Sequence, residues 1–167
     1  MIKADHDTAD KSELVIRSAN RTDSATLAEF ARYLAKEEGR QGSSTSETIA
    51  QAIDAQQAEF LLAWQNEKPL GMLMFYMGYD LESASAGAHL GDIFVMREAR
   101  RQGVARTLMA TMAQLVSQRG GTWISLTVLQ QNKEAIKLYK ALAMQEVDVR
   151  FMAIGVRGLR EWILSDA

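Results

Sequence analysis

The stretch LGDIFVMREARRQGVARTLMATMAQLVSQRG, residues 90–120, contains the strongest structural signals in this chain. Near its start, the short apolar run at residues 93–96 is bounded by charged residues and predicts a buried strand. A basic turn at residues 97–102 follows and is closed by Gly103. Apolar residues then recur at helical spacing and predict a helix from about Gly103 to just before residue 120, at Val104, Leu108, Met112, Leu115 and Val116.

A strand that leads through a glycine-containing loop into a helix is typical of an anion-binding site. The first N–H groups of a helix lack helical partners, and the helix dipole places partial positive charge there. Gly103 and Ala105 are small enough for the backbone to approach phosphate oxygens. Arg100, Arg101 and Arg106 add long-range attraction for a polyanion. The spacing matches neither GxGxxG nor GxxxxGK[ST], so nucleotide folds of those two kinds are not indicated.

Composition excludes several classes of protein. The chain has 167 residues, a net charge of -2 and a pI of about 5.7, which suits one domain and predicts no nucleic-acid partner. It has no cysteine and only two histidines, so we expect neither disulfides nor a metal site. We find no signal peptide and no apolar run of membrane-spanning length, and we expect a cytoplasmic protein with no membrane partner.

The order of predicted elements is βααβββαβαβ followed by an amphipathic tail. Strands are predicted at residues 14–17, 60–64, 70–79, 87–96, 123–129 and 147–154, with the tail at residues 158–164. Helices are predicted at residues 27–38, from a cap at Ser44 or Ser46 to residue 53, at 104–119 and at 132–142. This order predicts an α/β (α+β) fold with a mixed, mostly antiparallel twisted sheet and helices on both faces. Residues 1–12 are predicted to be a flexible lead-in and residues 13–167 a single domain.

Two motifs carry a resemblance to a known family. Arg100-x-x-Gly103-x-Ala105 resembles the pyrophosphate loop of the GNAT N-acetyltransferases, Arg/Gln-x-x-Gly-x-Gly/Ala. Asn132-x-x-Ala135-x-x-x-Tyr139 resembles the family's helix beside the coenzyme thiol. The resemblance extends from residue 14 to residue 154. It implies the GNAT fold, an N-acetyltransferase domain at residues 13–167 and acetyl-CoA as cosubstrate, with no metal.

Residues 71–96 resemble the diamine acetyltransferase branch of this family. The matching residues are Phe75-Tyr76, Tyr79-Asp80 and the Asp-x-Phe-Val-Met run at residues 92–96. Lys36-Glu37-Glu38 resembles the acidic acceptor-binding site of the branch. The pattern departs at Gly91, where the branch carries a glutamate, so the usual base of the branch is missing here.

The resemblance implies direct acetyl transfer in a ternary complex. An alkyl amine with a pKa near 10.4 must lose a proton before it attacks a thioester, and the leaving thiolate benefits from protonation. Asp92 is the candidate for positioning or deprotonating the amine, and Tyr139 is the candidate general acid. Glu38, Asp80 and Asp92 are the candidate acceptor-binding residues. The candidate coenzyme-binding residues are Ile93, Phe94, Val95, Arg100, Arg101, Gln102, Gly103, Val104, Ala105, Arg106, Asn132 and Ala135.

Each assignment has a structural alternative. Tyr139 lies on an apolar helix face where a core role is common, and Asp92 could cap a turn or pair with an arginine. Glu38 and Asp80 could be solvated loop charges. His89 could act as a base, although a histidine in a strand is more often structural.

The sequence predicts an acetyl-CoA-dependent N-acetyltransferase that acts on a primary amine of a small molecule, either a diamine or polyamine or an amino-acid-like acceptor. One alternative is a protein N-terminal or lysine acetyltransferase. Another is a non-catalytic coenzyme-A-binding regulatory module. The resemblance also implies a homodimer, with residues 76–79 and the tail around Trp162 as contact surfaces.

Overall fold

The computed structural model describes residues 13–165, and the chain divides after Val128 into two compact units. The first unit contains five strands and three α-helices, and the second contains two α-helices. The predicted lead-in at residues 1–12 lies outside the described residues.

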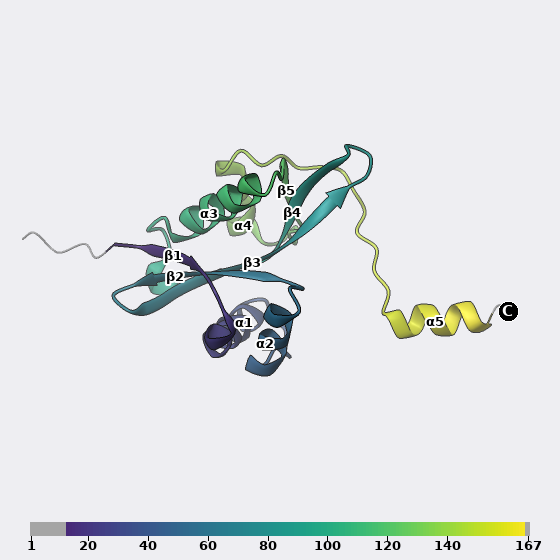
Figure 1. Ribbon diagram of the computed structural model, residues 1–167, viewed down its shortest axis with the longest axis horizontal. Helices are drawn as coiled ribbons and strands as arrows, with labels where there is room; N and C mark the ends of the chain where they lie inside the picture. Colours follow the sequence, from purple (N-terminus) through teal and green to yellow (C-terminus); the bar gives the residue numbers. More distant parts are fainter. Residues whose placement is uncertain (1–12, 166–167) are drawn as a thin grey trace, which may run out of the picture. The chain divides into compact units, whose positions relative to one another are not determined.

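A five-stranded sheet forms the centre of the first unit (Figure 1). Its strands are β1 (Val15–Ser18), β2 (Glu59–Gln65), β3 (Lys68–Asp80), β4 (Ser85–Val95) and β5 (Trp123–Leu126), and they lie side by side in sequence order. The first three pairs are antiparallel, whereas β4 and β5 are parallel because a helix connects them. The predicted mixed, mostly antiparallel sheet is therefore confirmed.

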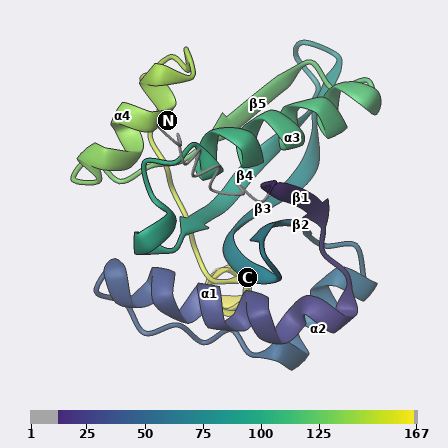
Figure 2. The ribbon, with the colours of Figure 1, turned by 90° about the vertical axis from the view of Figure 1, so that its left-hand side faces the viewer.

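Helices cover both faces of this sheet, as predicted (Figure 2). Helices α1 (Ser24–Glu37) and α2 (Ser46–Asp54) lie on one face and α3 (Val104–Gln118) on the other. On the face of α1 and α2, apolar side chains with little or no exposure form a core cluster of Leu27, Ala28, Phe30, Ile49, Leu62, Met72 and Phe94. The core between α3 and the sheet explains the helical spacing of its buried residues Val104, Leu108, Met109, Met112 and Val116.

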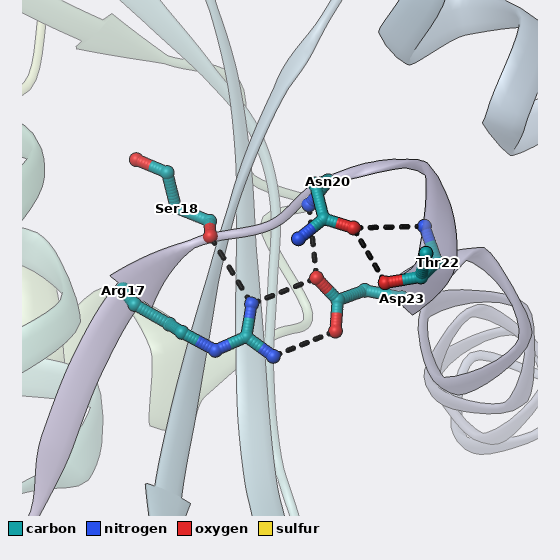
Figure 3. Close-up of polar contacts among 5 residues, drawn as sticks. All are labelled: Arg17, Ser18, Asn20, Thr22 and Asp23. Carbon is teal, nitrogen blue, oxygen red and sulfur yellow. Dashed lines mark hydrogen bonds and ion pairs between the residues drawn. The ribbon is translucent and has the colours of Figure 1, made fainter.

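An ion pair fixes the joint between β1 and α1 (Figure 3). The guanidinium of Arg17 donates two hydrogen bonds of 2.7 Å to the buried carboxylate of Asp23. The backbone N–H of Asn20 donates a third to Asp23, at 2.9 Å. In return, the Asn20 side chain accepts from the backbone N–H of Thr22 at 2.8 Å. These bonds satisfy the polar groups at the start of the helical segment.

The second unit contains α4 (Lys133–Ala141) and α5 (Val156–Ser165). The predicted strand at residues 147–154 is wrong, because the structure assigns no strand to that stretch. Its apolar residues, such as Val147, Val149 and Phe151, are largely exposed. Their alternation indicates β propensity, but a strand also needs a partner for its backbone groups, and the alternation does not specify one. The predicted amphipathic tail is helical within α5.

Candidate active site

The carboxyl-terminal half of β4 has one edge that no strand of the described residues covers. The pairing of β4 with β5 ends at Leu90 opposite Leu126, whereas β4 continues to Val95. Over this last stretch β4 pairs with β3 alone, with Phe94 opposite Met72. Backbone groups on an uncovered strand edge can bind an extended ligand in the manner of an added strand. This is the geometry that the predicted role of residues 93–95 requires.

A β-bulge at Gly91 separates the paired and unpaired halves of β4. Met74 lies opposite Asp92 and Phe75 lies opposite Leu90, so Gly91 is the extra residue. A Cβ atom at Gly91 would lie 2.4 Å from the Cε atom of Met74. The end of the Met74 side chain therefore fills the space where a side chain at position 91 would begin.

Asp92 follows this bulge and is partly buried. Side chains two residues apart on a strand share a face, so Asp92 lies on the same face as Phe94. The Phe94 ring is 5.6 Å from that of Phe30 and 6.1 Å from that of Tyr33, both in α1. Asp92 therefore faces the α1 side of the sheet. Burial raises the pKa of the Asp92 carboxyl, and the positive charge of Arg40 acts in the opposite direction on this pKa.

Glu38 and Arg40 lie at the end of α1. The backbone N–H of Glu38 donates to the carbonyl of Leu34 at 3.1 Å and ends the helix. The carboxylate of Glu38 forms an ion pair with the guanidinium of Arg40. Glu38 and Asp92 are thus linked through Arg40, which pairs with the first and acts electrostatically on the second. Arg40 is not among the predicted site residues; the signal for it is a basic residue two positions after Glu38, at the end of the helix.

Asp80 lies at the carboxyl-terminal end of β3, away from Glu38, Arg40 and Asp92. One carboxylate oxygen accepts from the Ser83 hydroxyl at 2.6 Å and the other from the backbone N–H of Glu82 at 3.1 Å. These bonds, that from Ser83 first, lower the pKa of Asp80. Asp80 lies six positions after Met74, the β3 partner of Asp92, a span of roughly 20 Å. The structure therefore does not bring Asp80 to Glu38, and the carboxylate holds the β3–β4 turn.

His89 has contacts that suit a structural role. Its Nδ1 atom lies 3.0 Å from the hydroxyl of Ser125 on β5. Its ring lies 5.3 Å from the ring of Tyr76 on β3. Contacts to both neighbouring strands agree with the structural alternative for this histidine.

The loop before α3 has the features of an anion site. Arg101 and Gly103 adopt left-handed backbone conformations, with φ of 64° and 88°, which suits glycine at the second position. No side chain of the described residues caps α3, so its first N–H groups keep their capacity to bind a ligand. Apart from Gly103 and its two chain neighbours, no atom of the described residues lies within 4 Å of the position that a Cβ at Gly103 would occupy. Val104 is buried beneath the loop, while the side chains of Arg101 and Arg106 are exposed.

Arg100 has a different environment from the other loop arginines. Its Nε atom donates to the carbonyl of Val95 at 2.9 Å, and one terminal nitrogen donates to the carboxylate of Glu37 at 2.7 Å and 2.8 Å. Arg97 also donates to Glu37, at 3.0 Å. Arg100 therefore connects the loop to β4 and α1. Gln102 is likewise engaged within the loop, donating to the carbonyl of Glu98 at 2.7 Å.

In the second unit, the predicted motif occupies the start and one face of α4. The side-chain oxygen of Asn132 accepts from the backbone N–H of Ala135 at 3.2 Å and caps the helix. Tyr139 lies about two turns after the cap, on the same face as Ala135. All three residues are partly buried. The cap gives Asn132 a structural function in α4 in addition to its predicted contact with the coenzyme.

Two features are absent from residues 13–165. No group of three His, Cys, Asp or Glu side chains in this range is arranged to hold a metal ion. None of the helices described there has both the length and the apolar character needed to cross a membrane.

The mixed sheet with an uncovered β4 edge, beside a glycine loop at a helix start, defines an acyltransferase fold suited to a coenzyme thioester. The sequence model of the Acetyltransferase (GNAT) family matches residues 26–144, and the chain belongs to this family. Its members use acetyl-CoA as cosubstrate.

Curated relatives add similarity over part of the chain. It is 34% identical over 98 residues to a thialysine N-epsilon-acetyltransferase of Caenorhabditis elegans, covering 58% of this chain and 59% of that protein. It is 32% identical over 78 residues to the protein of the same name from Bos taurus, covering 47% and 45%. The match therefore spans about half the length of these relatives.

Solved structures share the fold. An aminoglycoside acetyltransferase from an uncultured soil metagenomic sample, in complex with trehalose, is similar with a TM-score of 0.74 and 18% identity, covering 85% of this chain and 96% of that one. A ribosomal-protein-alanine N-acetyltransferase from Brucella melitensis biovar Abortus 2308 is similar with a TM-score of 0.73 and 18% identity, covering 86% and 99%. Their names differ in the acceptor, so the fold by itself does not specify the acceptor.

Proposed function

We propose that the protein transfers the acetyl group of acetyl-CoA to a primary amine of a small molecule, either a diamine or polyamine or an amino-acid-like acceptor. The observation that carries this proposal is the partly buried Asp92 beside the uncovered edge of β4. The similarity to two proteins named for acetylation of thialysine, an amino acid with a side-chain amine, supports an acceptor of this kind.

The first unit has the groups that coenzyme binding requires. Backbone groups of Ile93, Phe94 and Val95 on the uncovered edge would bind the pantetheine arm, and a backbone N–H there would polarise the thioester carbonyl. The N–H groups of residues 101–106 would hold the pyrophosphate, with attraction from Arg101 and Arg106. Arg100 would keep this loop in place through Val95 and Glu37. Acetyl-CoA supplies the acetyl group as an activated thioester.

Proton transfer would involve two residues. Asp92 would accept the proton of the amine, directly or through water, and its raised pKa makes it a better base than an ordinary aspartate. Tyr139 would donate a proton to the departing thiolate, with Asn132 and Ala135 contacting the coenzyme arm. Transfer would be direct within a ternary complex, as the family resemblance implies, and the absence of cysteine fits this mechanism. A homodimer and a cytoplasmic location complete the proposal.

The test is thiol release from acetyl-CoA with a panel of diamines, polyamines, amino acids, aminoglycosides and peptides. We expect turnover with small primary amines. We also expect the Tyr139→Phe variant to lose roughly 100-fold or more in kcat, because a positioned acid contributes at least this much. As a matched control, Tyr33→Phe removes a hydroxyl that donates to Glu29 on the surface of α1, and it should retain activity. Acetyl-CoA binding without turnover of any amine would contradict the transferase function.

A further inference from the structure

Arg40 is held by the end of α1 but keeps an accessible guanidinium. Its backbone N–H donates to the carbonyl of Ala35 at 2.8 Å, and Gly39 turns the chain with a φ of 67°. The side chain of Arg40 is 63% exposed although it pairs with Glu38. A guanidinium has five N–H donors, and one carboxylate uses at most two of them. Arg40 can therefore bind a second anion while Glu38 keeps it in place.

The position of Arg40 relates it to the proposed base. Asp92 faces the α1 side of the sheet, and Arg40 follows the end of α1. Glu37, three positions before Arg40, accepts from Arg100, which also donates to the carbonyl of Val95, so the end of α1 lies beside the end of β4. The positive charge of Arg40 also opposes the rise that burial causes in the pKa of Asp92. An acceptor whose amine reaches Asp92 would therefore extend toward Arg40.

The charges of Glu38, Arg40 and Asp92 favour one kind of acceptor. Glu38 and Asp92 supply two negative charges and Arg40 one positive charge, so a single negative charge remains. The glutamate of the diamine branch is absent at Gly91, and the Met74 side chain occupies the adjacent space. A diamine with two positive charges would meet Arg40 as a repulsive group. A molecule with an amine at one end and a carboxylate at the other would match both Asp92 and Arg40.

We propose that Arg40 is a specificity-determining residue that binds a carboxylate of the acceptor, so that this site selects amino-acid-type amines over diamines. This inference rests on the proposed acetyltransferase function and specifies its acceptor class. The guanidinium would donate two hydrogen bonds to the carboxylate, while Asp92 engages the distal amine.

The experiment compares three acceptors of similar length: L-lysine, L-lysinamide and 1,5-diaminopentane. For the wild type, we expect kcat/KM to be highest with lysine, because only lysine carries a carboxylate. The Arg40→Gln variant should lose about 10- to 100-fold in kcat/KM for lysine, as expected for one lost charge-assisted contact. It should not lower kcat/KM for the two other amines, and it should raise kcat/KM for 1,5-diaminopentane because the repulsive charge is lost. Arg40→Glu should raise kcat/KM for 1,5-diaminopentane, since it replaces a repulsive charge with an attractive one.

Arg21→Gln is the matched control, because Arg21 is also an exposed arginine paired with a carboxylate, that of Asp54. This variant should show the wild-type order of acceptors. An equal loss with all three acceptors in Arg40→Gln would mean that Arg40 only supports the local structure, and it would overturn the inference. A wild type that prefers 1,5-diaminopentane would overturn it and leave the acetyltransferase function intact. A wild type inactive on every primary amine would overturn both.

Discussion

In the proposed mechanism, Asp92 contributes to catalysis at a cost to the stability of the fold. Burial raises its pKa in the folded protein above the value in the unfolded chain. The stability that it contributes is therefore fully present below its unfolded pKa and is lost as the pH rises through its folded pKa. At neutral pH the partly buried carboxylate thus destabilises the fold, while in the proposed mechanism it acts as the base.

The Asp92→Asn variant tests this relation. We expect it to unfold at the same or a higher Tm than the wild type at pH 7, because the buried charge is gone. Its kcat/KM should fall by roughly 100-fold, the contribution expected of a general base. The acid limb of the wild-type pH–rate profile, at a pH above that of an ordinary aspartate, should disappear. Thermal unfolding and the pH dependence of kcat/KM check these outcomes, and an active variant with an unchanged profile would remove Asp92 from the mechanism.

The residues differ in how far the sequence could predict their roles. Gly103 and Asp92 could be proposed as site residues because each lies in a local motif of a strand or a helix start. The pairing of Arg100 with Glu37 was not predicted, because the two lie 63 positions apart and only the packing of α1 against the loop brings them together. The position of Met74 beside Gly91 could likewise not be predicted from the sequence, since it depends on the register of β3 against β4.

The joint between β1 and α1 depends on the carboxylate of Asp23. The guanidinium of Arg17 holds the pKa of Asp23 below its usual range, while burial opposes this effect. A lowered pKa contributes stability above the unfolded pKa, and this stability is lost as the pH falls through the folded pKa. The joint should therefore weaken in acid.

The Asp23→Asn variant measures this contribution. We expect it to lower the free energy of unfolding at pH 7 by about 1.5–3 kcal/mol, the range for hydrogen bonds to charged groups. The difference from the wild type should shrink as the pH falls from 7 toward 3. Urea unfolding across this range is the measurement. The exposed pair of Arg21 and Asp54 supplies the control, since Asp54→Asn should cost at most about 1 kcal/mol. A constant difference at all pH values would contradict the ion-pair explanation.

Most elements could be predicted because their apolar periodicity reflects a buried face. Strand β4 and helix α3 were found within a residue or two of their observed ends. The strand predicted at residues 147–154 was wrong because alternation alone does not supply a partner strand. Strand β5 ends at Leu126, earlier than predicted, and its early end leaves part of β4 uncovered.

Two exposed aromatic side chains lie in the regions proposed as contact surfaces of the homodimer. Tyr76 is 44% exposed and Trp162 is 61% exposed. We expect light scattering coupled to gel filtration to give twice the chain mass of 18.6 kDa. Trp162→Arg should shift the mass toward the monomer, because it places a charge on an apolar contact surface. Leu81→Ser removes an exposed apolar side chain from the β3–β4 turn and should leave the mass unchanged. A monomeric wild type would contradict the dimer.

The contact between Gly91 and Met74 has an evolutionary consequence. A carboxylate cannot be introduced at position 91 alone without displacing the Met74 side chain, whose methyl carbon lies 2.4 Å from the position of the new Cβ. The effects of changes at these two positions are therefore expected to be interdependent. A lineage that moves between the glutamate-bearing arrangement and this one must either turn the flexible end of the Met74 side chain away or change the residue on β3. Packing at this bulge therefore influences which substitutions accumulate together, in addition to the demand for a new acceptor.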